Sequence, residues 1–374
     1  MVLPVVQAEF QIGRAEAALP YTLLMVGFGL GGVLMGRLSD RFGLFRPLLG
    51  ASCAIGAGFG LAAFSDGIIG FAIAHGVLIG LVGCAVTFAP LMADTALWFA
   101  RRRGIAVAVC ASGNYLAGAV WPPVMEHFIA TAGWRATYIG VGLFCTCSMA
   151  LLALLMRQSA PGAIAAGPSN MASPRERPFD LSPNAATAAL CVAGLSCCVA
   201  MAMPQVHIVA YCTDLGFGAA RGAQMLSIML ACGIISRLAS GALSDRIGGI
   251  RTLVLGSALQ CTALLLFLPF DGLVPLYIVS AMFGLFQGGI VPSYALVVRE
   301  NFSARQIGMR VGTVIMFTML GMALGGWMSG KVFDLTGSYH AAFLNGIGWN
   351  LLNLVIAITL LVRLKRKKSE SDPD

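Results

Sequence analysis

A short charged segment occurs twice in this chain, each time between long apolar runs. The first copy is Gly36-Arg-Leu-Ser-Asp40-Arg41-Phe-Gly43, and the second is Gly241-Ala-Leu-Ser-Asp245-Arg246-Ile-Gly248. The flanking runs are long enough to cross a bilayer, and charges are costly in its apolar interior. Each copy is therefore expected at the membrane surface, between one helix that leaves the membrane and the next that enters it.

The repeat extends beyond the motif. Asp245 follows Asp40 by 205 positions, and the segment that begins at Asp214 aligns with the one that begins at Glu9 at the same offset. A period of this length is far longer than that of a solenoid repeat, and it indicates two related halves of one membrane bundle.

The composition agrees with a membrane protein that crosses the bilayer many times. Of the 374 residues, 58% are hydrophobic and 11% are charged, which is far from the average of soluble domains. The 11 cysteines lie in or at the ends of apolar runs and are interpreted as small hydrophobic residues. Because no catalytic triad, metal-ligand cluster or phosphate-binding loop stands out, we expect no enzyme activity, no metal and no cofactor.

Eleven apolar runs approach the roughly 20 residues that a spanning helix needs. The repeat requires a partner for the run 185–210 that ends near residue 5, so Met1 to Val6 are expected to form the last turns of a largely missing first helix. The predicted fold is all-α, with about eleven full transmembrane helices. The runs cover residues 17–34, 47–64, 67–93, 104–128, 138–156, 185–210, 222–243, 252–269, 274–298, 308–332 and 340–364.

Four segments are expected: an N-terminal transmembrane half (1–156), a polar linker (157–183), a C-terminal six-helix half (184–364) and a basic tail (365–374). Most of the 24 lysines and arginines fall on the side of the two motifs. This asymmetry predicts that the motifs, the linker and the C-terminus are cytoplasmic, in the inner (plasma) membrane of a cell. The basic tail is interpreted as an anchor on that membrane rather than a nucleic-acid patch.

The motif Gly-x3-Asp-Arg-x-Gly, present after the second helix of each half, resembles the signature loop of the major facilitator superfamily. The resemblance covers essentially the whole chain and implies two six-helix halves that rock about a central site. It also implies that the motif braces the cytoplasmic gate, with simple topological charges as the alternative. The gating residues implied are Gly36, Asp40, Arg41, Gly43, Gly241, Asp245, Arg246 and Gly248.

Three further stretches narrow the resemblance: the first is similar to the monocarboxylate transporters, and the other two are similar to bacterial members of the monocarboxylate and oxalate/formate-antiporter branch. They are Trp98 to Ala106 with Ser112-Gly113, Gly133 to Tyr138, and Gln205 to Gly216. Ala108 stands where the first pattern usually has glycine. The similarity indicates the branch more strongly than any one substrate.

Arg237 is the first candidate for a substrate-binding residue. It lies in an apolar run, eight residues or about 12 Å of helix rise before Asp245, and an intramembrane arginine suggests function. In the resembling family an arginine spaced Arg-x3-Gly from the motif, as with Gly241 here, pairs with the substrate carboxylate. The alternative is that its side chain snorkels to the interface. The family's proton-coupling aspartate, one turn earlier, is replaced here by Gly233.

Four other polar residues are candidates for the substrate site. Asn114, Tyr115 and Gln287 are expected near the midplane, and His207 could relay protons. Asn114 and Gln287 could equally hold helices together. Glu126, followed by a histidine, is expected near the outer face and could be no more than an interfacial residue.

Glycines at helical spacing are expected to let two helices slide across the boundary between the halves. Gly27, Gly31, Gly32 and Gly36 recur in spacing as Gly321, Gly325, Gly326 and Gly330.

The leading hypothesis is therefore a secondary transporter that moves a small organic anion, a monocarboxylate or dicarboxylate, by alternating access. The expected partners are this anion, protons as a candidate coupling ion, and the lipid bilayer, with no nucleic acid and a monomeric state. A proton-driven exporter of drugs or metabolites, a sensor without transport, and an inactive truncated paralogue remain alternatives.

Overall fold

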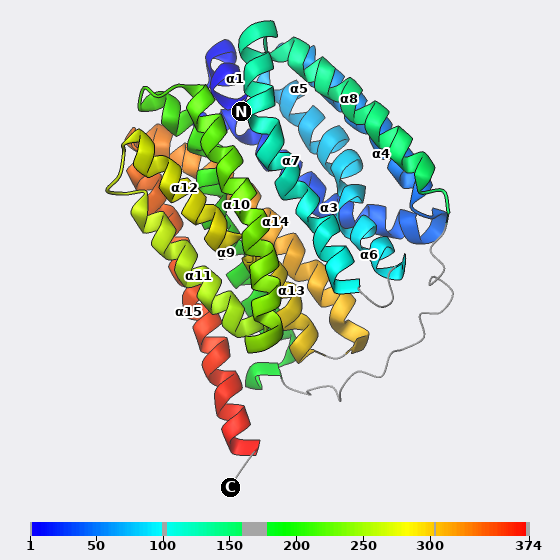
Figure 1. Cartoon of the computed structure of the whole chain (residues 1–374), viewed down its shortest axis with the longest axis vertical. Coiled ribbons are helices and arrows are strands. Elements are labelled where there is room, and N and C mark those ends of the chain that lie inside the picture. Colours follow the sequence, from blue (N-terminus) through cyan, green and yellow to red (C-terminus); the bar gives the residue numbers. More distant parts are fainter. Residues whose placement is uncertain (1, 99–102, 159–177, 303, 372–374) are drawn as a thin grey trace.

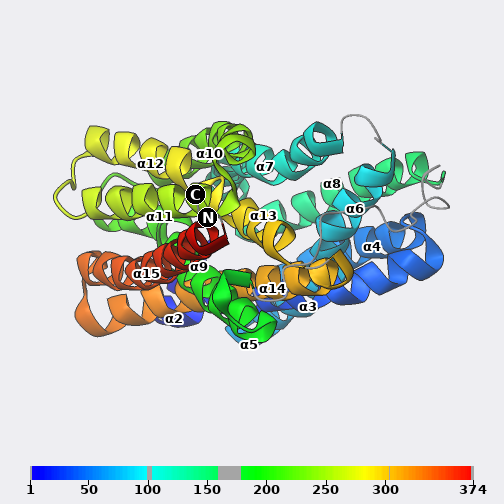
Figure 2. The ribbon, with the colours of Figure 1, turned by 90° about the horizontal axis from the view of Figure 1, so that it is seen from below.

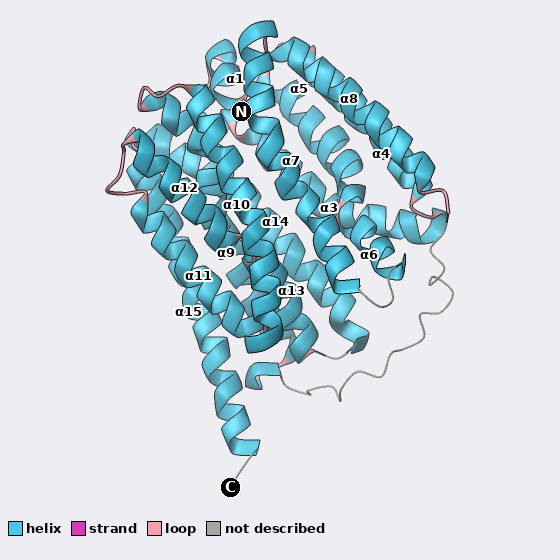
Figure 3. Ribbon diagram, in the orientation of Figure 1, coloured by secondary structure: helices cyan, strands magenta, loops and turns pink. Residues whose placement is uncertain are grey.

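The computed structural model describes residues 2–98, 103–158, 178–302 and 304–371 (Figure 1). These residues form helices and connecting turns without a strand (Figure 3), and ten of their helical segments are long and apolar enough to span a membrane. An eleventh long helix, α7, runs from Arg103 to Ala132. The prediction of an all-α membrane protein is confirmed.

The first group of helices contains the first copy of the motif. Its members are α1 (Leu3–Phe10), α2 (Arg14–Ala17), α3 (Leu19–Phe42), α4 (Phe45–Ala63), α5 (Ile68–Ile73), the π-helix η1 (Ala74–Cys84), the 3-10 helix η2 (Ala85–Thr87), α6 (Ala89–Trp98), α7 and α8 (Trp134–Leu155). The short helix α1 ends at Phe10 and is followed by Gln11 in the left-handed conformation, with a φ of 52°.

The second group contains the second copy and a larger core. Its members are η4 (Pro178–Asp180), α9 (Pro183–Asp214), α10 (Ala219–Ile247), α11 (Gly249–Leu266), α12 (Leu273–Gln287), α13 (Ile290–Asn301), α14 (Ala304–Thr336) and α15 (Tyr339–Ser371). The central helix is α9, which packs against α10, α14 and α15. Most of the linker expected at 157–183 lies outside the described residues, as do residues 372–374. The basic tail continues α15, which projects beyond the bundle (Figure 1).

The two copies of the motif lie at one end of the bundle, called here the motif end; the opposite end is called the far end. The final glycine of each copy stops its helix with a positive φ, 73° at Gly43 and 86° at Gly248. This backbone conformation is open to glycine and strained for other residues. The chain can therefore leave α3 and α10 abruptly and enter the next helix within a few residues.

The two groups of helices meet along α3 with α14 and along α7 with α10 (Figure 2). Near the far end the hydroxyl of Thr22 donates to the carbonyl of Ala323 at 3.1 Å. Further along, a Cβ at Gly29 would lie 3.5 Å from Met319. The next positions on the same faces are Gly36 on α3 and Gly312 on α14, and neither has a described heavy atom within 4 Å of its Cβ position. The halves therefore diverge toward the motif end.

The glycine-rich faces do not all serve the boundary between the halves. A Cβ at Gly31 would lie 2.2 Å from the carbonyl oxygen of Leu81 on η1, and one at Gly325 would lie 2.4 Å from that of Val199 on α9. Gly27 and Gly321 face the same two helices. These four glycines permit close packing inside each half, which corrects the expectation of a sliding contact.

Only part of the pattern meets the other half. Cβ atoms at Gly326 and Gly330 would approach Tyr21 and Arg14 at 3.0 and 2.8 Å. Gly32, like Gly36, has no described heavy atom within 4 Å of its Cβ position. On α14, the face with Gly321 and Gly325 therefore meets its own half, whereas the face with Gly326 and Gly330, about 100° away, meets the other half.

Candidate functional site

Arg237 reaches from α10 across the boundary to α7. Its Nη1 donates to the carbonyl oxygen of Ala111 at 2.8 Å, and its Nε donates to that of Gly288 at 3.4 Å. The guanidinium carbon lies 4.3 Å from the centre of the Tyr115 ring. One cation therefore touches both halves: the backbone and an aromatic ring of α7, and the break between α12 and α13.

Small residues make room for this arrangement. A Cβ at Gly233 would lie 2.4 Å from the Tyr115 ring, and one at Gly288 would lie 2.4 Å from the carbonyl oxygen of Gly233. The absence of side chains at these two glycines lets α12 approach α10 closely while the tyrosine ring enters from α7. Gly233 stands where the resembling family has an aspartate, and the ring of Tyr115 occupies the space that the aspartate side chain would need.

The contacts of Arg237 are neutral. Among the described residues no carboxylate lies within ion-pair distance of its half-buried guanidinium, whose partners are two backbone carbonyl oxygens and the side chain of Tyr115. A cation stacked on a partly desolvated aromatic ring gains about 0.5–2 kcal/mol. An anion that reached this cation would add the charge neutralisation that the present contacts lack.

Gln287 ends α12 beside Gly288. Its side chain is fully buried, and its Oε1 accepts a hydrogen bond of 2.8 Å from Nε2 of Gln205 on α9. Its own Nε2 has no partner among the described residues. Gln287 was predicted as a site residue because of its expected position near the membrane midplane. Gln205 lies in one of the stretches that resemble the family but was not predicted as a site residue.

His207 lies in a different environment, inside the second half. It is fully buried, its Nε2 lies 2.8 Å from the carbonyl oxygen of Gly326, and its ring centre is 5.9 Å from that of Tyr339. These neighbours belong to α14 and α15, whereas the partners of Arg237 belong to α7 and the α12–α13 break. The structure therefore does not bring His207 together with Arg237.

Two further candidates on α7 are not drawn into the Arg237 contacts. Asn114 is exposed, one residue from Tyr115 and therefore turned away from α10 by about 100°. Glu126 is half-buried near the far end of the helix, and the histidine after it is exposed. Of the residues selected on α7, the structure places only Tyr115 against the arginine.

The implied gating residues occupy the motif end. Arg41, Asp245 and Arg246 are exposed, and Arg41 lies over the ring of Phe42 at 5.2 Å. Neither Asp245 nor Arg246 makes an ion pair with another described residue. The side chain of Asp40 lies outside the described part of the chain. Gly36 and Gly241 have no described heavy atom within 4 Å of their Cβ positions.

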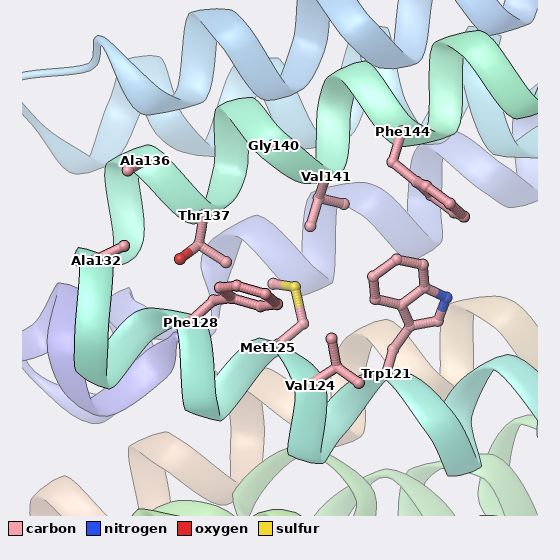
Figure 4. A pocket seen from close by; sticks show the side chains of 10 residues that line it. All are labelled: Trp121, Val124, Met125, Phe128, Ala132, Ala136, Thr137, Gly140, Val141 and Phe144. Carbon is pink, nitrogen blue, oxygen red and sulfur yellow. The ribbon is translucent and has the colours of Figure 1, made fainter.

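An apolar groove of about 360 Å³ lies between α7 and α8, away from Arg237. Side chains of both helices face one another across it, with Phe128 and Met125 below Val141 in the view of Figure 4. Its lining offers little besides carbon, so it lacks the polar groups that would fix a polar metabolite. The site that the sequence predicts and the groove are thus separate features.

Comparison with known proteins agrees with this architecture. Monocarboxylate transporter 13 of Bos taurus is 28% identical over 328 residues, which cover 86% of this chain and 75% of that protein. The uncharacterized MFS-type transporter YhjX of Escherichia coli (strain K12) is 24% identical over 329 residues, which cover 85% of this chain and 78% of the relative. A crystal structure of the nucleoside transporter NupG has a TM-score of 0.72 at 12% identity and covers 97% of this chain and 94% of that one, which is a likeness of fold.

The family model of the Major Facilitator Superfamily matches residues 1–275 and 251–374. These two matches together run along the whole chain. The relatives named above are transporters and not enzymes. The two-fold motif, the helical bundle and these matches lead to one conclusion: the chain belongs to the Major Facilitator Superfamily and is a multi-pass membrane protein of a transporter family.

Proposed function

We propose that this protein is a secondary active transporter that carries a small organic anion, of the monocarboxylate or dicarboxylate type, by alternating access. The observation that carries the proposal is the guanidinium of Arg237, which lies between the halves with neutral partners. A guanidinium matches a carboxylate in shape and charge. The names of the monocarboxylate transporters that the chain resembles support the same substrate class.

In this proposal Arg237 exchanges partners during the cycle. An entering carboxylate replaces the carbonyl oxygen of Ala111, and the ring of Tyr115 remains as a platform for the cation. The contact between Arg237 and α7 is then weakened when substrate binds, so binding changes the relative stability of the two rocked states. Gln287, whose buried Nε2 has no partner in the part of the chain that the structure describes, lies beside Gly288 and is a further donor for the bound anion.

The orientation in the membrane follows from charge. Because most lysines and arginines gather at the motif end, we place that end in the cytoplasm of a cell's inner (plasma) membrane. The divergence of the halves toward the motif end then corresponds to a state open to the cytoplasm. The motif residues Asp245 and Arg246 are exposed in this state, as expected of a gate brace that engages when that end closes.

The test is uptake into proteoliposomes of labelled lactate, pyruvate, oxalate and formate, with and without a pH gradient. We expect one of these carboxylates to be transported and Arg237→Ala to lose it by about 10- to 100-fold, because a hydrogen bond to a charged group is worth about 1.5–3 kcal/mol. The matched control is Arg221→Ala, which removes an exposed arginine from the far end of the same helix, where its Nη1 donates to Oε1 of Gln224 at 3.3 Å. Carboxylate uptake by Arg237→Ala at the parental rate would refute the ligand role.

A further inference from the structure

Three ion pairs are found among the described residues, and all three lie at the far end. Two of them join residues within one half, whereas the third joins the two halves. The pair inside the first half is Glu9 with Arg135, the pair inside the second is His340 with Asp271 at 3.8 Å, and the pair between the halves is Arg14 with Asp214 at 2.6 Å.

The contact between the halves has two parts. Nη2 of Arg14 donates to both carboxylate oxygens of Asp214, at 2.6 and 2.8 Å. The carboxylate of Asp334, at the end of α14, accepts the backbone N–H groups of Arg14 and Ala15 at 2.8 and 2.9 Å. Two carboxylates of the second half thus hold one short segment of the first half, and we call Arg14, Asp214 and Asp334 the far-end lock.

Burial and packing strengthen the lock. The side chain of Arg14 is 9% exposed, and its guanidinium lies 5.1 Å from the ring centre of Phe333. Gly330 brings the α14 backbone so close that a Cβ there would lie 2.8 Å from the carbonyl oxygen of Arg14. A charge held in such surroundings becomes strongly unfavourable when its partner is removed.

The lock is nevertheless incomplete. Nε and Nη1 of Arg14 are buried without a hydrogen-bond partner among the described residues. The side chain of Asp214 is 33% exposed, so water can replace the arginine there. The hydrogen bonds to Asp214 and Asp334 stabilise the closed far end, and the unsatisfied donors of Arg14 limit that stabilisation. A gate needs a contact of this kind, which holds one state and can still break.

We infer that Arg14, Asp214 and Asp334 form the gate lock of the far end, which keeps the halves closed there while they are apart at the motif end. When the halves rock the other way, the backbone contacts to Asp334 and the contact of the Arg14 Nη2 with Asp214 must separate together. Neutralising either carboxylate therefore shifts the protein toward the state that is open at the far end. The inference rests on the alternating access of the proposed function, but not on the identity of the substrate.

The test measures access to the space that the lock closes. Thr22 lies eight residues after Arg14, about 12 Å deeper, and contacts Ala323 across the boundary. Thr22→Cys is placed in a full-length chain whose 11 cysteines are replaced. A membrane-impermeant maleimide is then added from the far-end side of oriented vesicles, and the labelling rate is measured.

We expect Asp214→Asn and Asp334→Asn each to raise the labelling rate about tenfold, which corresponds to a shift of one decade in the population of the open state. The matched control is Asp271→Asn, which removes a carboxylate at the same end that accepts from Tyr211 at 2.6 Å within the second half. The control should keep the parental rate.

Parental labelling rates in both lock variants, or an equal acceleration in the control, would overturn the inference. If an asparagine variant is not recovered as a folded protein, Arg14→Lys is measured instead, because lysine keeps the charge and loses the planar guanidinium that lies against the ring of Phe333. The labelling rate of Arg14→Lys should lie between the parental rate and the tenfold higher rate expected for the asparagine variants. A parental rate in Arg14→Lys would count against the lock. Because labelling needs no substrate, failure of the anion proposal would leave this result unaffected.

Discussion

Two adjacent glycines on α14 should respond differently to the same substitution. A Cβ at Gly325 would lie 2.4 Å from the carbonyl oxygen of Val199 and 2.7 Å from its Cα, both in the backbone of the same half. A Cβ at Gly326 would lie 3.0 Å from the ring of Tyr21, a side chain of the other half. Gly325→Ala is thus a change in the packing of one half, and Gly326→Ala is a change in the contact between halves.

The magnitudes follow from these neighbours. Alanine gains up to about 1 kcal/mol over glycine in a helix, whereas overpacking costs about 1–3 kcal/mol, nearer the upper value when the obstacle is backbone. Gly325→Ala should therefore lower the free energy of unfolding by about 2 kcal/mol. For a folding unit the size of one half, this corresponds to a fall of roughly 4–8 °C in melting temperature. For Gly326→Ala the ring can shift, so the two terms nearly cancel in stability while the closed far end is strained.

The assay combines thermal unfolding in detergent with the Thr22→Cys labelling rate. Gly325→Ala should melt lower and label at the parental rate, and Gly326→Ala should melt near the parent and label faster. Equal melting temperatures in the two variants, or faster labelling in Gly325→Ala alone, would refute the assignment of the two glycines to different neighbours.

Three further outcomes are expected. Gly233→Asp should abolish transport, because Tyr115 occupies the space that the new side chain needs, and Tyr115→Ala in the same chain should restore part of it; no restoration would mean that the ring is not the obstacle. Tyr115→Leu alone should raise KM for the carboxylate about two- to thirtyfold, as the loss of about 0.5–2 kcal/mol of cation–π attraction predicts, and an unchanged KM would argue against the platform. Hydrogen bonds from Arg135 and Trp134 lower the pKa of Glu9 from 4.5, so this contact stabilises the fold fully above about pH 4.5 and is lost as the pH falls through the lowered pKa. The difference in melting temperature between the parent and Glu9→Gln should accordingly be constant from pH 8 to about pH 5 and vanish in stronger acid; a difference that persists there would contradict the pairing.

The sequence predicted the helical architecture because the decisive signals are long. Each spanning run remains apolar over about 20 residues, and the motif follows the same helix in both halves. The final glycine of each motif was recognisable as part of the pattern, and its positive φ at Gly43 and Gly248 gives the physical reason. The family follows from the same signals and is confirmed by the match to its sequence model.

The far-end lock could not be predicted in the same way. In the sequence Arg14 is one of 24 lysines and arginines, and its partners lie 200 and 320 positions away in the chain. Only the packing of α14 against α2 and α9 brings them together. The available signal was weak: an arginine and two aspartates, Asp214 and Asp334, all at span boundaries on the same side.

The glycine pattern and His207 show a second limit. Glycines at i and i+4 indicate a helix face without side chains, which permits close packing. They do not indicate which neighbouring helix lies against that face. Gly325 and Gly326 differ by 100° around α14 and meet different halves. Likewise, the depth of His207 in its span was readable from sequence, whereas its direction, toward Gly326 and Tyr339, was set by the packing of α14 and α15.

The most direct test of the central claim is equilibrium binding of a labelled carboxylate to the purified protein, with Arg237→Ala and the control Arg221→Ala measured beside the parent. We predict that the parent and Arg221→Ala bind with the same Kd and that Arg237→Ala binds at least about tenfold more weakly. Equal Kd values for all three proteins would contradict the claim that the arginine between the halves holds the anion.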